Sequence, residues 1–237
     1  MLGALSYLPH REVWNLALVA SIHDAQALGA SLVASLQGTH QVQFNDHKRT
    51  SLVSVTVLSV VEEGVGAIAE CRHDLNTDGT NLLLDLGNGT TSLSVFGPRG
   101  KLEQRSVEPY GVEELIDAIA RNLNTRRKWS KEGDRHLIRS GIETRSFTYG
   151  NTKWNFRSIY DAELKPWATK ALAPVLRRSE QWMASSDAAI AIGGGSQLPA
   201  IRELLTRKGI APLAGGVFAN ALGLLKIARA KQGQLGG

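Results

Sequence analysis

The chain has 237 residues, a formal net charge of +5 and 43% hydrophobic residues, so it can bury a substantial core. Its apolar runs are too short or too interrupted to cross a bilayer, which predicts no membrane partner, and its first residues lack the basic region and cleavage site of a signal peptide. A single cysteine, Cys71, excludes an internal disulfide framework and predicts a cytoplasmic protein.

The N-terminal part of the chain mixes helical and extended patterns. Residues 14–36 predict mostly helix, or a helix with a strand, and Gln41-Val42-Gln43-Phe44 alternates as a strand does. Residues 52–61 are rich in valine and leucine at strand spacing. Glu62-Glu63-Gly64 ends this strand, and residues 66–71 predict a short helix.

An aliphatic strand then delivers a carboxylate into a glycine turn, in the segment Leu83-Leu84-Asp85-Leu86-Gly87-Asn88-Gly89-Thr90-Thr91, and the chain leaves as a second strand. Gly87 and Gly89 remove side chains where backbone N–H groups could approach an anion. A carboxylate beside such a cradle suits a metal ion that bridges to phosphate. Asn-Gly is also the strongest short-range hairpin signal, so the segment is a hairpin, a phosphate loop or both.

Gly97-Pro98-Arg99-Gly100 predicts a further turn, and residues 111–123 have the apolar spacing of an amphipathic helix. From Arg121 to Arg157 Lys and Arg outnumber acidic residues, and this stretch predicts an irregular insertion with short helices. Aromatic residues interleave with it, and such a pattern could grip nucleic acid by phosphate contact and stacking. A solvated surface or a protein–protein face explains such charge runs more often, so direct nucleic-acid contact is the less favoured interpretation.

The rest of the chain predicts, in order, a long helix kinked by prolines, a buried strand, a glycine run, a helix opened by Pro199 and a last helix. These elements span residues 161–182, 188–192, 193–196, 199–206 and 219–230. Strands therefore alternate with helices along the chain, which predicts an α/β protein.

Two of these segments together resemble the nucleotide-binding loops of the actin-like ATPase superfamily. Asp85-Leu86-Gly87-Asn88-Gly89-Thr90-Thr91 is similar to its second phosphate loop, and Ile190-Ala191-Ile192-Gly193-Gly194-Gly195-Ser196 is similar to its adenosine loop. Gly111-Val112, Phe218-Ala219-Asn220-Ala221-Leu222-Gly223-Leu224 and Trp14-Asn15-Leu16 are similar to segments of the ParM/StbA-type plasmid-segregation proteins. The resemblance implies an α/β, actin-like (ribonuclease H-like) ATPase fold.

The resemblance also implies ATP and Mg²⁺ as ligands, with Asp85 holding the metal through water. The implied phosphate-binding residues are Gly87, Asn88, Gly89, Thr90 and Thr91, and the implied adenosine-binding residues are Gly193, Gly194, Gly195 and Ser196.

The implied chemistry is in-line phosphoryl transfer to water. In the family a Gln or Glu at the end of the preceding strand positions the attacking water, and Glu62 matches that place, with Glu63 as a second candidate. The alternative for Glu62 is a helix-start carboxylate that the helix dipole favours.

One part of the family pattern is missing. No Asp-x-Gly occurs in residues 1–84, and His23-Asp24-Ala25-Gln26 is not predicted to follow a buried strand. We therefore expect a fold that is incomplete at the N-terminus, with residues 1–70 as a remnant of actin-like domain I. Residues 71–237 are then domain II, with a basic insertion at about 121–160 and a C-terminal helix. Without the first phosphate loop, half of the nucleotide clamp is absent, which predicts weak ATP binding.

The implied function is ATP hydrolysis coupled to filament formation for plasmid DNA segregation. The implied partners are further copies of the chain and a DNA-bound adaptor protein, and the truncated chain could itself be inactive. Two alternatives remain open: a non-polymerising phosphotransferase of the same fold, and a nucleic-acid or adaptor-binding module that uses the basic insertion. Salt-dependent DNA binding without nucleotide would favour the last of these.

Overall fold

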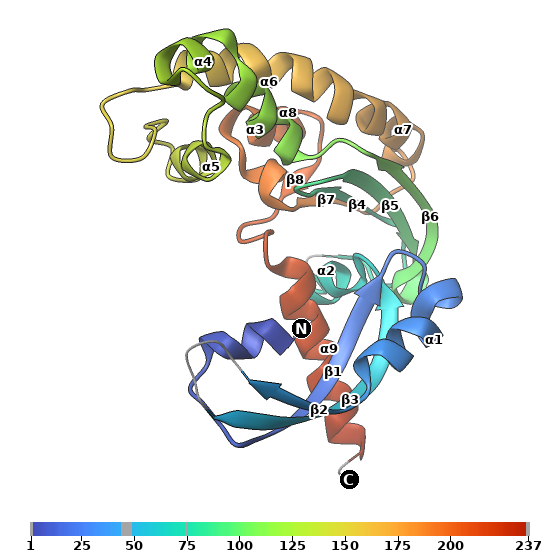
Figure 1. The fold of residues 1–237 in the computed structure, drawn as a ribbon. Helices are drawn as coiled ribbons and strands as arrows, with labels where there is room; N and C mark the ends of the chain where they lie inside the picture. Colours follow the sequence, from blue (N-terminus) through green and yellow to red (C-terminus); the bar gives the residue numbers. More distant parts are fainter. Residues whose placement is uncertain (1, 44–48, 74, 236–237) are drawn as a thin grey trace. The chain divides into compact units, whose positions relative to one another are not determined.

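The computed structural model describes residues 2–43, 49–73 and 75–235, and its contacts divide the chain into two compact units (Figure 1). One unit consists of Met1–Cys71 together with Ala219–Gly237, and the other of Arg72–Phe218. None of the helices in the described ranges is long and apolar enough to span a membrane.

The first unit is a three-stranded sheet with helices. Its sheet has the order β1-β3-β2, in which β1 pairs parallel and β2 pairs antiparallel with β3. Trp14, Val53 and Val55 from the sheet form a small core with Leu5. The elements are η1 (Leu2–Tyr7), β1 (Val13–Ile22), α1 (Ala25–Leu36), β2 (Gly38–Gln43), β3 (Thr50–Glu62), α2 (Val65–Glu70) and α9 (Ala219–Leu235).

Two expectations for this unit need correction or restriction. Residues 14–36 form the strand β1 and then the helix α1, which agrees with the predicted combination of a helix with a strand. His23 and Asp24 therefore do follow a strand, and Asp24 caps α1 by accepting a hydrogen bond from the Ala27 N–H at 2.8 Å. Leu and Ala in β1 favour helix locally, but pairing with β3 overrides that preference. The predicted strand at residues 41–44 is β2, and its last residue, Phe44, lies outside the described residues.

Helix α9 packs with the first unit, whereas the sequence analysis assigned it to the second domain. It contacts α2, β1 and β3. The crossing with α2 is close: a β-carbon added to Gly223 would lie 1.6 Å from the carbonyl oxygen of Gly66. Lys226 also pairs with Glu70 at 3.0 Å between Nζ and Oε2. Segments far apart in sequence therefore build this unit.

The second unit is a five-stranded mixed sheet with the order β6-β5-β4-β7-β8. Helix α7 packs on β4, β5 and β6, while α3 packs on α5 and α6, and α8 on β8 (Figure 1). Its elements are β4 (Asn81–Leu86), β5 (Thr91–Gly97), η2 (Pro98–Gly100), β6 (Lys101–Glu108), α3 (Val112–Arg121), α4 (Leu123–Trp129), α5 (Arg135–Glu143), α6 (Arg157–Ala171), α7 (Ala173–Met183), β7 (Ala188–Ile192), η3 (Gly194–Gln197), α8 (Pro199–Arg207) and β8 (Ala211–Pro212).

The basic stretch of this unit forms α4, α5 and the loop after them, and its aromatic side chains belong to the core. Phe147, Phe156 and Tyr160 are buried. Trp129 stacks on Tyr149 with ring centroids 4.8 Å apart. The buried rings are thus unable to stack on nucleic-acid bases, which weakens the nucleic-acid interpretation, although Trp129 and Trp154 are partly exposed.

Candidate nucleotide-binding site

The turn after Asp85 is a hairpin that joins two central strands. Leu86 pairs with Thr91 across β4 and β5, and the Gly87 N–H donates to the Thr90 carbonyl oxygen at 2.9 Å. Asp85, Gly87, Asn88, Gly89 and Thr90 are all at least partly exposed. The hairpin interpretation is therefore confirmed for the backbone, and the turn remains accessible to a ligand.

The start of α3 holds this turn in place through backbone hydrogen bonds. The N–H groups of Val112 and Glu113 donate to the carbonyl oxygens of Gly87 and Asn88 at 3.0 and 2.8 Å. A β-carbon added to Gly111 would lie 2.2 Å from the Asn88 carbonyl oxygen, so only glycine allows this approach. The Gly111 carbonyl oxygen in turn accepts from the buried indole Nε1 of Trp167 at 2.7 Å. These contacts satisfy the first free N–H groups of the helix and fix the turn.

The sheet brings the glycine run beside Asp85. Strand β7 pairs parallel with β4, which places Ile192 opposite Asp85 and Gly193 directly after it. Gly193 has φ 79° and ψ 162°, a conformation that is essentially restricted to glycine. A β-carbon there would lie 2.6 Å from Asp85 Oδ1 and 2.4 Å from the Leu86 carbonyl oxygen. The two segments that the sequence analysis singled out are thus in contact, about a hundred residues apart in sequence.

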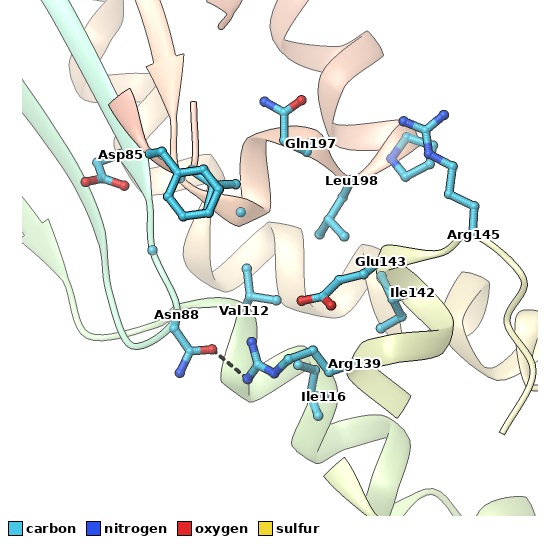
Figure 2. A pocket seen from close by; sticks show the side chains of 16 residues that line it. Asp85, Asn88, Val112, Ile116, Arg139, Ile142, Glu143, Arg145, Gln197 and Leu198 are labelled. Atoms are coloured by element: carbon cyan, nitrogen blue, oxygen red, sulfur yellow. Dashed lines mark hydrogen bonds between the residues drawn. The ribbon is translucent and has the colours of Figure 1, made fainter. Parts of the chain in front are cut away.

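A pocket of about 610 Å³ opens between these two turns, and residues of the second unit alone line it (Figure 2). Five predicted site residues line it: Asp85, Gly87, Asn88, Gly193 and Gly194. Its apolar wall comprises Val112, Ile116, Ile142, Leu198, Pro199, Val217 and Phe218. Apolar walls with a few convergent polar groups are typical of small-molecule sites.

The other predicted residues of the two loops do not line this pocket, and two of their hydroxyl groups are already engaged. Thr91 is fully buried, and its hydroxyl donates to the Tyr110 carbonyl oxygen at 2.8 Å. Ser196 is also fully buried and donates to the Gly193 carbonyl oxygen at 2.7 Å. The other predicted residues that do not line the pocket are Gly89, Thr90 and Gly195. The Ser196 hydroxyl therefore holds the backbone of its own turn, whereas the Thr91 hydroxyl ties the start of β5 to the segment before α3.

Sequence reasoning missed three charged residues of the pocket, namely Arg139, Glu143 and Arg145. They come from α5 and the loop after it, within the basic stretch (Figure 2). Arg139 pairs with Glu113 at 2.5 Å, and Arg145 has φ 58°. The charge run was the available signal, but it could not indicate which of its residues face the pocket.

Glu62 lies at the end of β3 in the first unit, and its carboxylate is engaged at a helix start. Its Oε1 accepts from the Ala25 N–H at 2.8 Å, at the beginning of α1. A carboxylate in this place is favoured by the positive end of the helix dipole. Its assignment to water activation stays a prediction.

The single carboxylate of Asp85 fits a hard cation whose other ligands are mostly waters and phosphate oxygens. Nowhere in the described ranges do three or more His, Cys, Asp or Glu side chains gather as a metal site. Mg²⁺ is commonly bound through one or two carboxylates together with waters and substrate phosphates. Asp85, partly exposed beside the glycine turn, fits that pattern.

This combination of a mixed sheet, two glycine turns on neighbouring strands and a pocket between them is that of an actin-like fold. No protein-family model matches the sequence, and no curated protein matches it significantly. Solved structures do. The archaeal actin homolog Ta0583 in complex with ADP has a TM-score of 0.78 and 17% identity, covering 97% of this chain and 76% of that chain.

Two further solved structures agree with this result. The Alp12 filament structure has a TM-score of 0.65 and 15% identity, over 98% of this chain and 73% of that chain. ParM of Bacillus thuringiensis in its apo form has a TM-score of 0.61 and 16% identity, over 98% of this chain and 67% of that chain. The predicted α/β, actin-like fold with likeness to ParM is therefore confirmed.

Proposed function

We propose that this chain binds ATP with Mg²⁺ in the pocket of its second unit. The observation that carries the proposal is the contact between Asp85 and Gly193, which joins an acidic glycine turn to a second glycine turn around one pocket. An actin homolog of similar fold is recorded with ADP, which supports a nucleotide as the ligand.

The proposed roles follow from the chemistry of each turn. Mg²⁺, when bound, supplies positive charge against the phosphates, and the Asp85 carboxylate holds it through water. Asn88, Gly89 and Thr90 offer donors to the phosphates, whereas the Gly87 N–H is bonded to the Thr90 carbonyl oxygen and Gly87 lines the pocket through its backbone. Gly194 leaves room for the nucleoside beside the apolar wall, and Gly193 lines the same pocket while its missing side chain lets the backbone lie against Asp85 and Leu86. Thr91 and Ser196 have their hydroxyl groups engaged, so we assign them structural roles, Ser196 within the second glycine turn and Thr91 between β5 and the segment before α3.

We further propose that ATP hydrolysis, with Glu62 positioning the attacking water, is coupled to filament formation. Further copies of the chain would then be partners, and a DNA-bound adaptor would link the filament to plasmid DNA. The likeness to ParM and to a filament of Alp12 supports self-association as the general function.

Titration calorimetry with ATP, with and without Mg²⁺, tests the binding step. Asp85→Asn preserves shape but removes the charge, so we expect it to abolish the Mg²⁺-dependent gain in ATP affinity, roughly tenfold. Asp161→Asn, at an exposed site paired with Arg157, is the matched control. Equal ATP affinity for wild type and Asp85→Asn in Mg²⁺ would contradict the metal role.

Pelleting with ATP, together with phosphate release, tests the filament and hydrolysis steps. Glu62→Gln retains an acceptor for the Ala25 N–H, so we expect normal folding and ATP binding but loss of phosphate release. Phosphate release by Glu62→Gln at the wild-type rate would rule out the assignment. No nucleotide-dependent pelleting of the wild type would rule out the filament step.

A further inference from the structure

Arg139 links the basic stretch to the phosphate turn. Its Nη2 donates to Asn88 Oδ1 at 2.8 Å (Figure 2). The same nitrogen donates to Glu113 Oε2 at 2.5 Å. Glu113 also donates its own backbone N–H to the Asn88 carbonyl oxygen at 2.8 Å. Asn88, Glu113 and Arg139 therefore form a closed ring of hydrogen bonds at the edge of the pocket.

This ring restrains the most exposed part of the turn. Asn88, Gly89 and Thr90 are exposed, and among the described residues Arg139 is the one side chain that hydrogen-bonds to any of them. The guanidinium group is a third exposed and Glu113 somewhat more, so solvent weakens the contact without removing it.

The chemistry of the two groups fixes the orientation of the Asn88 amide. Guanidinium nitrogens only donate, so Arg139 can bond the amide oxygen but not the amide nitrogen. The Nδ2 group, with its two donors, is then the remaining end of the side chain. Without Arg139 the Asn88 amide could rotate and turn its oxygen toward the ligand. That oxygen would repel an anionic phosphate group.

We propose that Arg139 is a positioning residue that holds Asn88 as a donor and thereby sets the affinity of the site for the phosphate part of the ligand. This inference rests on the proposed nucleotide binding. Arg139 acts through Asn88, and its charge is balanced by Glu113.

A double-mutant cycle tests this proposal. We measure the dissociation constants of ADP, ATP and adenosine for wild type, Asn88→Ala, Arg139→Ala and the double variant. Each single variant should weaken ADP and ATP binding about tenfold, and the double variant should also lose about tenfold because the two residues act as one unit. Adenosine binding should change by less than about twofold, since it lacks phosphate.

Two controls complete the experiment. Arg121→Ala removes another ion-paired arginine of the basic stretch, away from the pocket lining, and should leave all three affinities unchanged. Arg139→Lys retains a donor for Asn88 Oδ1 and should restore part of the ADP affinity. Melting curves establish that each variant is folded.

The outcomes separate the two proposals. A loss of about a hundredfold in the double variant would mean that Arg139 contacts the phosphates independently, and an equal loss of adenosine affinity would mean that it shapes the whole pocket. Either result overturns the positioning role while nucleotide binding stands. A wild-type chain that binds none of the three ligands overturns nucleotide binding and, with it, this inference.

Discussion

The two glycine turns beside the pocket are both held by hydrogen bonds but differ in how closely their glycines are packed. The turn at residues 87–90 is held by hydrogen bonds from its own backbone, from the start of α3 and from Arg139. A β-carbon on Gly89 would meet nothing within 4 Å. The turn at residues 193–195 also has hydrogen bonds, such as that from the Ser196 hydroxyl to Gly193, but in addition it is closely packed, because Gly193 has a positive φ and lies against Asp85 and Leu86.

This difference separates two reasons for glycine in a binding loop. At Gly193 the fold itself requires glycine, because both its φ and its neighbours exclude a side chain. At Gly89 the fold does not require glycine, so any requirement there must come from a ligand. A substitution at Gly193 should therefore mainly lower the free energy of unfolding, whereas a substitution at Gly89 should mainly lower the affinity for the ligand.

The largest effect is expected for Gly193→Ala. Adoption of φ 79° by alanine and the overlap with the Leu86 carbonyl oxygen should together cost about 3 kcal/mol or more in free energy of unfolding. Chemical denaturation measures this cost. Gly194→Ala is the matched control, since its added β-carbon has open space and should cost less than about 1 kcal/mol. Equal losses of unfolding free energy in Gly193→Ala and Gly194→Ala would show that close packing does not make glycine necessary at position 193.

A somewhat smaller effect is expected for Gly111→Ala, which tests the support of the first turn. Its β-carbon would overlap the backbone of Asn88 and Gly89, and the turn must shift away from α3 at a cost of about 2 kcal/mol. Because Gly111 has φ −118°, backbone strain contributes nothing. Phosphate-dependent nucleotide affinity should fall with stability in this variant. Retention of wild-type ADP affinity would show that α3 does not position the turn.

Tyr160→Phe is a substitution in the core, and its effect on stability can be compared with the effects of the substitutions in the two turns. Burial raises the pKa of Tyr160 to about 12, and no described residue hydrogen-bonds to its hydroxyl. Removal of that hydroxyl should increase stability at pH 7 by up to about 1 kcal/mol.

The same tyrosine predicts a pH dependence. The unfolded chain loses the Tyr160 proton near pH 10 and the folded chain near 12, so wild-type stability should decrease between these values, by up to roughly 3 kcal/mol. Tyr160→Phe should show a smaller decrease when unfolding is followed from pH 9 to 12. Identical alkaline profiles would contradict the burial effect.

The smallest effect on stability is expected for Gly89→Ala. Its β-carbon faces open space, so the free energy of unfolding should change by less than about 0.5 kcal/mol. If phosphates approach the backbone of this turn, however, the added methyl group should reduce ATP affinity about tenfold. Thermal unfolding and titration calorimetry on one sample measure both. Unchanged ATP affinity would place the phosphates away from Gly89.

Much of the second unit could be predicted because its signals are local. The strand before Asp85, the strand 188–192 and the helix opened by Pro199 follow from periodicity, glycine and proline placement. For residues 14–36 the sequence left helix alone and helix with strand both open, because the Leu and Ala residues of β1 favour helix locally, and pairing with β3 decides for the strand. The position of α9 was missed, since its contacts with α2 are distant in sequence.

By itself the sequence determined the α/β class, the acidic glycine turn and the glycine run, because each depends on residues adjacent in the chain. Only the tertiary structure decided which residues meet: Gly193 lies against Asp85, Arg139 bonds Asn88, and the Thr91 hydroxyl bonds the Tyr110 carbonyl oxygen. The reason is physical. Parallel pairing of β4 with β7 and packing of α5 on α3 join segments whose mutual position no local pattern encodes.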